Sequence, residues 1–257
     1  MQFYTLITGS SSGIGKALAT ECAARNHNLL LIALPGQDLE SISERLMADH
    51  GIHADYLNID LTEQQAAEKV YDWARQNQYH VNILINNAGI SFEGPFENHS
   101  VHFFEKSMKL NIVALVSLTR LFIDDMKSYP EAHILNLGSV ASYFPMPYKA
   151  VYSASKIFVY TFSMALREEF RKTGIKISVL APGPVVTNRH TAKSAIKKGK
   201  LARMMHTKTG FVAKYGVDRM LKGKAVIRVG FLSHFVFLVE KILPTPAKLK
   251  LAKLIFK

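Results

Sequence analysis

Residues 139–156 bring a serine, a tyrosine and a lysine into one short stretch that reads SVASYFPMPYKAVYSASK. If the second half of this stretch is helical, Tyr152 and Lys156 are four residues apart and share a face of the helix. An ammonium group beside a phenol favours the phenolate, so we expect the pKa of Tyr152 to lie below its usual value of about 10. With Ser139, such a pair can exchange a proton with one carbonyl or alcohol oxygen near neutral pH. A Tyr-x-x-x-Lys spacing alone is also common between neighbours on helix surfaces.

Four further motifs accompany this stretch. They are TGSSSGIG at residues 8–15, NNAG at 86–89, Asn111 within KLNIVALVSLTRLF, and PGPVVT at 182–187. In this order and spacing, over residues 3 to about 230, they resemble the short-chain dehydrogenase/reductase family. The resemblance implies an enzyme that interconverts a carbonyl and a secondary alcohol with NAD(P).

The resemblance also implies a role for each of four residues. Ser139 would hydrogen-bond the substrate oxygen, and Tyr152 would donate or remove its proton. Lys156 would hold the nicotinamide ribose and lower the tyrosine pKa, while Asn111 would keep a water beside the lysine. Each residue has an alternative interpretation, because Ser139 can cap a strand end, Asn111 can be a buried polar group of a helix, and Lys156 can be solvated.

The glycine-rich motif follows an apolar strand and opens a helix, which is the context of a phosphate-binding turn. Gly9 permits the turn, and Gly13 and Gly15 allow the backbone to come close to a ligand. The helix start then offers N–H groups and a positive dipole to a pyrophosphate. A glycine turn without a ligand is the alternative interpretation.

By resemblance, the remaining cofactor contacts come from strand ends. Asp60 would hydrogen-bond the adenine and Leu61 would supply a backbone contact, although Asp60 could instead cap a helix before Thr62. Asn86 is expected to hold the sheet together. The full set implied is Gly9, Ser11, Ser12, Gly13, Ile14, Gly15, Asp60, Leu61, Asn87, Ala88, Gly89, Tyr152, Lys156, Pro182, Gly183, Val185 and Thr187.

The choice between NAD(H) and NADP(H) depends on the end of the second strand, where an acidic residue binds a ribose 2′-OH and a basic one a 2′-phosphate. Residues 33–37 read ALPGQ and carry neither charge. With no carboxylate to repel a phosphate, and with Ser10, Ser11 and Ser12 as hydrogen-bond donors, the sequence favours NADP(H) without excluding NAD(H). His99 and His102 have no Cys or carboxylate partners at metal-ligand spacing, so no metal site is predicted.

The pattern of apolar runs predicts a Rossmann-type, doubly wound parallel sheet of about seven strands with helices on both faces. Strands are expected at 3–8, 28–34, 54–59, 81–85, 133–137, 175–181 and 225–229, and helices at 14–22, 38–50, 63–76, 100–127, 153–172 and 210–221. We expect one domain over 1–257, with a cofactor-binding and catalytic body at 1–188, a substrate loop, helix and last strand at 189–230, and a basic helical extension at 231–257.

The net charge of +12 is concentrated near one end of the sequence. Residues 1–188 carry 15 Lys and Arg against 18 Asp and Glu, whereas residues 189–257 carry 17 against 2. The single cysteine, Cys22, fits a reducing compartment and simple packing. With no signal peptide or transmembrane run recognised, the sequence predicts a cytoplasmic protein.

The extension ends in AKLKLAKLIFK, whose apolar residues alternate with lysines. A basic amphipathic helix of this kind can lie on an anionic membrane, bind an acidic carrier of the substrate, cover the substrate pocket or pack on a partner subunit. No recognised motif supports nucleic acid as a partner. The alternative function is a non-catalytic dinucleotide-binding protein that docks through this extension.

The substrate pocket is expected between residues 90–96, 141–148 and 189–215. The apolar side chains expected to line it are Phe92, Phe96, Tyr143, Phe144, Met146, Met204 and Met205. They favour a small hydrophobic substrate, an acyl or lipid-like carbonyl or alcohol. The alternative is that these side chains belong to the core. The family resemblance implies pairing of subunits through the long helices around Asn111 and after Tyr152. We therefore expect a homodimer or homotetramer.

Overall fold

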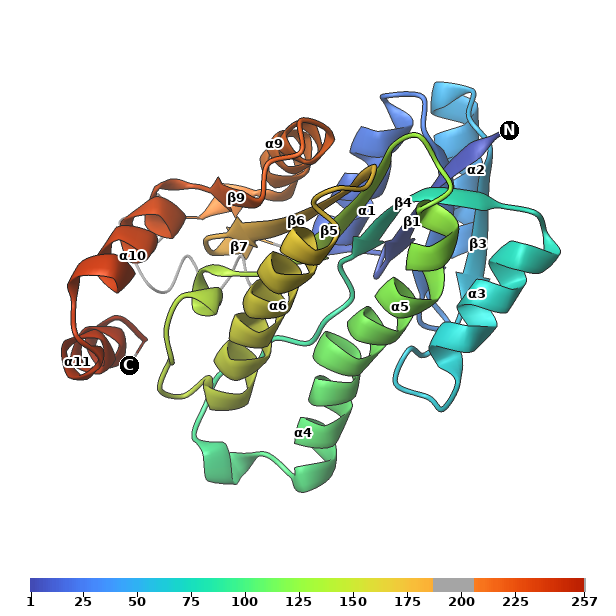
Figure 1. Ribbon diagram of the computed structural model, residues 1–257. Coiled ribbons are helices and arrows are strands. Elements are labelled where there is room, and N and C mark those ends of the chain that lie inside the picture. The colour runs from blue at the N-terminus through green and yellow to red at the C-terminus, as the bar shows by residue number, and fades with distance from the viewer. Residues whose placement is uncertain (187–205, 257) are drawn as a thin grey trace.

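A seven-stranded parallel sheet forms the centre of the molecule (Figure 1). The computed structural model describes residues 1–186 and 206–256. The strand order is β3-β2-β1-β4-β5-β6-β9, which confirms the predicted Rossmann-type fold. The strands are β1 (Phe3–Thr8), β2 (Asn28–Ala33), β3 (Ala54–Asn58), β4 (His80–Asn86), β5 (Ala132–Leu137), β6 (Ile175–Pro182) and β9 (Val226–Val229).

The central strands are buried on both faces, as their continuous apolar sequences predict. Along β2, Leu29 and Leu31 pack into one hydrophobic cluster. Leu30 and Ile32 point the other way and join a second cluster on the opposite face. The sheet therefore separates two hydrophobic cores.

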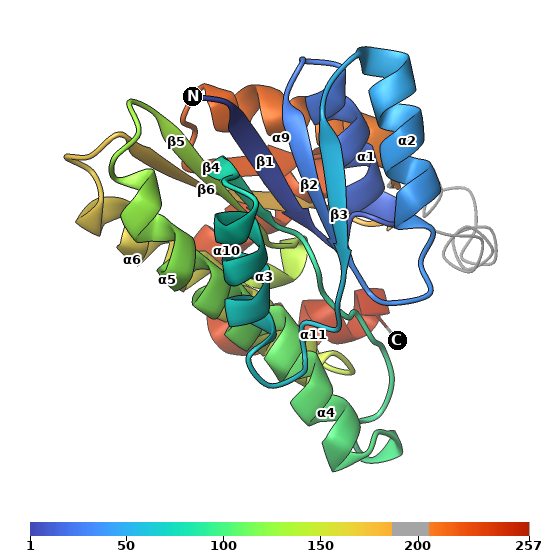
Figure 2. The ribbon, with the colours of Figure 1, turned by 90° about the vertical axis from the view of Figure 1, so that its right-hand side faces the viewer.

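Helices cover both faces of the sheet (Figure 2). Helices α1 (Gly13–Ala23), α2 (Leu39–His50) and α9 (Thr209–Leu221) enclose the first cluster. Helices α3 (Ala66–Gln76), α5 (Ala114–Met126) and α6 (Ala150–Glu169) lie over the other face. The chain reverses direction across the sheet between β1 and β4, and the carboxyl ends of those strands form the crevice where such sheets bind ligands.

The helix predicted at 100–127 is interrupted in its middle. Helix α4 (Val101–Met108) leads into a π-helical turn, η2 (Lys109–Val113), and then into α5. Asn111 lies within this turn. Single π-turns of this kind occur frequently at functional sites, because the extra residue redirects a side chain.

Two helix starts differ from the prediction. Helix α3 begins at Ala66 rather than at residue 63, because Gln65 takes a left-handed backbone with φ of 58°. Helix α6 begins at Ala150 rather than at 153, so its first turn includes Tyr152. Ser153 lies inside the helix, because its N–H donates to the Lys149 carbonyl at 2.7 Å.

Beyond β6 the chain forms two short strands that the sequence pattern did not predict. Strands β7 (Val185–Val186) and β8 (Thr207–Lys208) pair in parallel beside the main sheet. After β9 come two helices, α10 (Phe231–Ile242) and α11 (Thr245–Phe256). Among the described residues, no helix combines the length and the apolar character that crossing a membrane requires.

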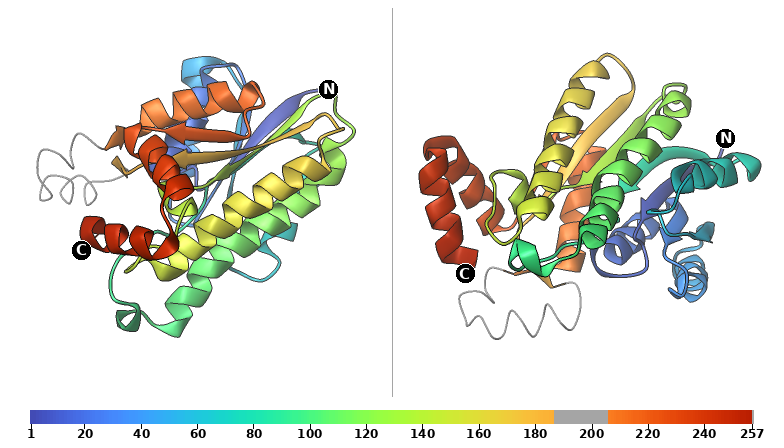
Figure 3. Two further views of the ribbon diagram at one scale, coloured as in Figure 1. Left: turned by 60° about the vertical axis from the view of Figure 1, so that its left-hand side comes forward. Right: turned by 90° about the horizontal axis from the view of Figure 1, so that it is seen from below.

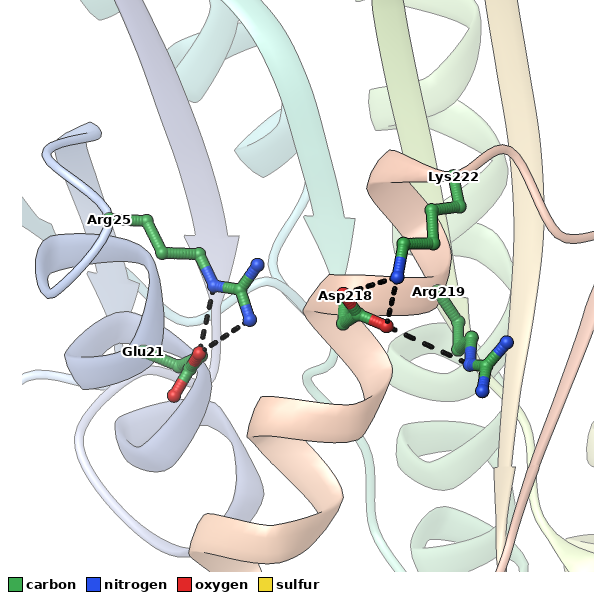
Figure 4. A network of polar contacts seen from close by, with 5 residues as sticks. All are labelled: Glu21, Arg25, Asp218, Arg219 and Lys222. Atoms are coloured by element: carbon green, nitrogen blue, oxygen red, sulfur yellow. Dashed lines mark hydrogen bonds and ion pairs between the residues drawn. The ribbon is translucent and has the colours of Figure 1, made fainter.

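Helices α1 and α9 pack side by side and carry small ion-pair clusters at their surface (Figure 4). Glu21 pairs with Arg25 at 2.8 Å within α1, and Asp218 pairs with Lys222 at 3.0 Å within α9. Exposed pairs of this kind contribute little to stability. The contact between the two helices therefore depends mainly on their buried apolar residues, Leu18 and Val212 among them.

Candidate active site

The carboxyl ends of the strands bring the predicted catalytic residues together. Ser139 follows β5 and starts a short 3-10 turn, η3 (Val140–Ser142), while Tyr152 and Lys156 lie one helical turn apart on α6. The side chains of Ser139 and Ser91 lie close enough to the Tyr152 hydroxyl to lower its pKa. Ser91 was missed by the sequence reasoning, because a single serine after NNAGI carries no distinguishing pattern.

Lys156 is buried directly beside the tyrosine. Its side chain is only 5% exposed, and its Nζ donates to the Leu137 carbonyl at 2.7 Å. The Nζ lies 5.9 Å from the centre of the Tyr152 ring. Burial lowers the pKa of Lys156 to about 8, so the group still carries a proton at neutral pH.

The predicted lowering of the Tyr152 pKa is wrong for this structure. Burial raises the pKa of Tyr152, and the nearby side chains of Ser139 and Ser91 offset only part of that effect. The ammonium group of Lys156 donates to a backbone carbonyl and not to the phenol oxygen. Tyr152 is therefore a protonated phenol at neutral pH, which is the form that can donate a proton to a substrate oxygen.

Ser139 serves both as a cap and as a partner of Tyr152. Its Oγ accepts from the Ala141 N–H at 3.1 Å, and its own N–H donates to Ser142 Oγ at 3.1 Å. The capping interpretation is thus correct. A hydroxyl that accepts one bond keeps its own hydrogen available, so the Ser139 O–H can still donate to another oxygen.

Asn111 is buried and fixes the loop that follows NNAG. Its Oδ1 accepts from the Ile90 N–H at 2.8 Å, and its Nδ2 donates to the Ile90 carbonyl at 3.0 Å. Nδ2 also approaches Ser155 Oγ of α6 at 3.3 Å. These bonds join the π-turn, the loop and the helix that carries Tyr152.

Gly89 leaves an open surface between Asn111 and Lys156. A Cβ atom added there would lie 3.0 Å from Asn111 Oδ1 and 3.7 Å from Lys156 Nζ. Gly89 is itself exposed. A side chain at this position would fill the space next to both polar groups, so glycine leaves that space free.

The glycine turn has the backbone geometry that the sequence predicts. Gly9 has φ of +66°, and a Cβ on Gly15 would lie 2.0 Å from the Gly9 carbonyl oxygen. No side chain can be accommodated at Gly15. Ser12, the N-cap of α1, makes no side-chain capping bond, which leaves the first N–H groups of the helix available to an anion.

The NNAG loop is held against this turn by Thr8. Its Oγ1 accepts from the N–H groups of Asn87 and Ala88, both at 3.0 Å. The Asn87 Nδ2 donates in return to the Thr8 carbonyl at 2.8 Å. Asn86 bonds instead to Thr119 and Asn136, so it joins strands and helix as expected.

The predicted adenine-side residues have close local partners. Asp60 Oδ1 accepts from the N–H and Oγ1 of Thr62 at 2.9 and 2.7 Å, which closes a local turn. The interpretation of Asp60 as a helix cap is wrong, because α3 begins only at Ala66. Its Oδ2 pairs with Lys106 Nζ at 3.0 Å. Burial raises the pKa of Asp60, but the bonds from Thr62 and Lys106 outweigh it and lower the pKa overall. Leu61 packs its side chain into the core.

The three serines of the turn are not equivalent. Ser10 is fully buried, and its hydroxyl donates to the Ile32 carbonyl at 3.2 Å. The expectation that Ser10 is a donor to a cofactor phosphate is therefore wrong. Ser11 is half-buried and Ser12 is exposed, and both remain suitable.

The PGPVVT segment leaves the sheet beside the site. Gly183 N–H donates to the Val229 carbonyl at 3.1 Å, and Pro184 accepts from the Thr207 N–H at 2.9 Å. These bonds position Pro182, Gly183 and Val185 at the end of β6. Thr187, Met204 and Met205 lie outside the described residues.

An aromatic cluster forms one wall near Tyr152. The Phe92 ring lies 6.4 Å from that of Tyr152 and contacts Phe103 and Phe104 at 5.1 and 5.6 Å. Phe96 stacks on Phe104 and is 62% exposed. These side chains form an apolar cluster next to Tyr152.

The other aromatic residues assigned to the pocket belong to the core. Tyr143, Phe144 and Met146 are at most 9% exposed and pack with Leu232 and Val236 of α10. These three side chains therefore stabilise the core and do not line the predicted substrate pocket. Tyr152 packs against the same cluster.

A separate apolar groove of about 300 Å³ lies between α6 and α11, away from this chemistry. It presents the α6 positions 150, 153, 154 and 157, which face a different side of the helix from Tyr152 and Lys156. Its lining residues are Pro145, Met146, Pro147, Ala150, Ser153, Ala154, Ile157 and Leu249.

The arrangement fits a dinucleotide lying along the strand ends. The backbone at Gly9 and Gly15 is bare and precedes free N–H groups, while Gly89 leaves an open path toward Lys156. Within residues 1–186 and 206–256, no cluster of three His, Cys, Asp or Glu side chains could hold a metal ion.

Comparison with known proteins gives consistent matches. A family model described as short chain dehydrogenase matches residues 4–198. The 17-beta-hydroxysteroid dehydrogenase type 3 of Mus musculus is 36% identical over 191 residues, and the very-long-chain 3-oxoacyl-CoA reductase of Anas platyrhynchos is 31% identical over 190. Each alignment covers 72% of this chain and 60% of the relative, so the chain spans about 60% of their length.

A solved structure extends the match to the fold. A short-chain dehydrogenase from Sphingobium yanoikuyae, in complex with NADPH, superimposes with a TM-score of 0.78 and 27% identity. The superposition covers 88% of this chain and 87% of that one.

Proposed function

This chain belongs to the short-chain dehydrogenase family, and from that premise we propose that it reduces a hydrophobic carbonyl compound to a secondary alcohol with NADPH. The reaction is reversible, so the same site would oxidise the alcohol with NADP. The observation that carries the proposal is a protonated Tyr152 that lies next to Ser139 and beside the buried Lys156.

In the reductive direction, Tyr152, Ser139 and Lys156 would have different roles in protonating the substrate oxygen. The bound nicotinamide would supply the hydride. Tyr152 O–H would donate its proton to the carbonyl oxygen, and Ser139 O–H would hold that oxygen by a hydrogen bond. Lys156, still protonated at neutral pH because its pKa is about 8, would stabilise the phenolate that forms.

The cofactor would be held by the glycine turn at residues 8–15 and by the NNAG loop at residues 86–89. The N–H groups at the start of α1 would bind the pyrophosphate, and the backbone around Gly89 would face the ribose next to Lys156. The missing acidic residue at the end of β2 supports NADPH, and the Sphingobium relative binds NADPH.

A hydrophobic substrate is supported by two observations. The aromatic cluster of Phe92, Phe96, Phe103 and Phe104 lies beside the Tyr152 ring. The two similar enzymes act, by their names, on a 17-beta-hydroxysteroid and on a very-long-chain 3-oxoacyl-CoA. The steroid and the very long acyl chain are both apolar, so the proposed substrates are ketones or 3-oxoacyl thioesters with a large apolar group.

We also propose that the active form is a homodimer or homotetramer. Apolar side chains that are exposed on the long helices support this: Met108, Val113 and Phe158 are 42%, 54% and 39% exposed. A subunit contact over these helices would remove this apolar surface from water.

The proposal is tested by following NADPH consumption with a panel of ketones, aldehydes and 3-oxoacyl thioesters, first for the wild type and then for Tyr152→Phe. The variant should bind NADPH as tightly as the wild type but turn over about 10² to 10⁴ times more slowly, because it lacks the proton donor. Tyr160→Phe, on the same helix two turns later, is the matched control and should keep its activity.

Two results would contradict the proposal. Near-normal turnover of Tyr152→Phe would remove this residue from the mechanism. Tight NADPH binding without turnover of any compound in the panel would favour a non-catalytic dinucleotide-binding protein.

A further inference from the structure

Helix α10 carries a line of exposed apolar side chains, which we call the α10 stripe. It consists of Phe231, Phe235, Leu238 and Ile242, which are 82%, 44%, 57% and 77% exposed. Their spacing of four, three and four residues places them along one face of the helix. The rings of Phe231 and Phe235 stack at 6.2 Å.

The stripe faces away from the body of the molecule. The opposite side of α10 holds Leu232, Ser233 and Val236, which are all buried, and the Ser233 hydroxyl donates to the Ala181 carbonyl of β6 at 2.7 Å. Helix α10 is thus firmly attached to the sheet by one face. Figure 3 shows α10 and α11 together at the margin of the molecule.

The part of the chain that contains the stripe is rich in basic residues. Residues 206–250 contain nine Lys and Arg against two acidic residues. Both acids are paired, Asp218 with Lys222 at 3.0 Å and Glu240 with Lys248 at 3.4 Å. Lys241 borders the stripe on α10, and both Lys241 and Lys250 are exposed.

We propose that the α10 stripe docks this protein onto the surface of an anionic lipid bilayer. Phe231, Phe235, Leu238 and Ile242 would enter the boundary between headgroups and acyl chains, while Lys241 and Lys250 would lie among anionic headgroups. A second copy of the chain is a poorer occupant, because a two-fold contact through the stripe would bring the two sets of lysines together.

Docking in this way would bring the bilayer close to the candidate active site. Leu232 and Val236, on the inner face of α10, pack in the same cluster as Tyr143, and Tyr152 packs against that cluster. An apolar substrate dissolved in the membrane would therefore have a short path to the tyrosine. The docking itself does not depend on the proposed reaction.

The test is sedimentation with lipid vesicles at low salt. The protein should sediment with vesicles of equimolar phosphatidylcholine and phosphatidylglycerol, and much less with phosphatidylcholine alone. The double variant Phe231→Ser, Ile242→Ser should bind the anionic vesicles about tenfold more weakly or worse, because it loses the two most exposed residues of the stripe.

A matched control removes two exposed apolar residues elsewhere. Phe211 on α9 and Val101 on α4 are 57% and 74% exposed. The double variant Phe211→Ser, Val101→Ser should bind the vesicles as the wild type does. All three proteins should show the same circular dichroism and NADPH affinity, which excludes unfolding as the cause.

Three outcomes would overturn the proposal. The first is wild-type protein that stays in the supernatant with anionic vesicles, and the second is equal binding by the stripe variant and the wild type. The third is a stripe variant that changes the oligomeric state in lipid-free solution, measured by analytical ultracentrifugation, since the stripe would then be a subunit contact.

Discussion

Lys156 places a positive charge in a buried position, and this lowers the stability of the folded protein. The pKa of the side chain falls from 10.5 to about 8 through burial. Between these two values the unfolded chain binds a proton that the folded protein does not, so stability rises with pH across that window. Below about pH 8 the buried charge lowers the free energy of unfolding by on the order of 3 kcal/mol.

Replacing Lys156 by methionine should therefore stabilise the protein at pH 7 while abolishing turnover. Urea unfolding should give a free energy of unfolding about 1 to 3 kcal/mol higher than the wild type, and the gain should shrink as the pH approaches about 10. Lys224→Met, at an exposed position, should show neither effect. A Lys156→Met protein less stable than the wild type at pH 7 would contradict this.

Leu34 lies just after β2, at the strand end where we expect the cofactor to be selected, and it is 47% exposed. A guanidinium at this position can pair with a 2′-phosphate, whereas a carboxylate would repel it. Leu34→Arg should tighten NADPH binding about tenfold with little change for NADH, and Leu34→Asp should do the reverse. Fluorescence titration with each nucleotide measures both, and equal effects on NADPH and NADH would argue that this residue lies away from the ribose.

For individual residues, the sequence motifs predicted which side chains lie close together but not which hydrogen bonds they form. The glycine turn, NNAG, Ser139, Tyr152 and Lys156 meet at one edge of the sheet. The raised pKa of Tyr152 could not be foreseen, because it depends on burial and on the direction of the Lys156 hydrogen bond. The ion pair between Lys106 and Asp60 could not be predicted either, because 46 residues separate them and no sequence pattern connects them.

Among the elements, the strand–turn–helix from β1 to α1 is the most constrained. A Cβ on Gly15 would lie 2.0 Å from the Gly9 carbonyl, whereas one on Gly210 of α9 would meet nothing within 4 Å. Gly15→Ala should destabilise the protein by at least about 2 kcal/mol and abolish NADPH binding, because the turn must move. Gly210→Ala is the control and should be neutral or slightly stabilising.

Urea unfolding and nucleotide titration of both alanine variants provide the measurement. A Gly15→Ala protein that unfolds and binds NADPH like the Gly210→Ala control would show that the turn tolerates a side chain. That result would remove the turn from the proposed cofactor site.

The main strands and helices were predictable because each has a clear apolar period or run. Strand β2 is apolar throughout, and α5 repeats its apolar residues at helical spacing. The two-residue strands β7 and β8 have no such pattern, because they are too short to show a period. The π-turn at Asn111 was also missed, since one extra residue does not disturb the apolar pattern on either side.

For the molecule as a whole, buried histidines predict sensitivity to acid. Burial lowers the pKa of both His27 and His133, and the Glu131 carboxylate beside His133 raises the latter's pKa only in part. The folded state therefore binds fewer protons than the unfolded state just below pH 6.5, and stability is lost as the pH falls through this range.

His133→Leu should reduce this loss. His133 is 3% exposed and its Nδ1 has no hydrogen-bond partner, so an apolar side chain of similar size is suitable. Thermal unfolding at about pH 7 and about pH 5 should show a smaller difference for this variant than for the wild type. His102→Leu, at an exposed position of α4, is the control, and an undiminished difference for His133→Leu would contradict the assignment.

The most direct test of the whole account follows a labelled hydride into the product. NADPH carrying deuterium at the transferred position would be incubated with an apolar ketone or 3-oxoacyl thioester, and the alcohol analysed by mass spectrometry. The account predicts one deuterium on the former carbonyl carbon with the wild type and almost no product with Tyr152→Phe. Unlabelled alcohol, or labelled alcohol formed equally fast by the variant, would contradict it.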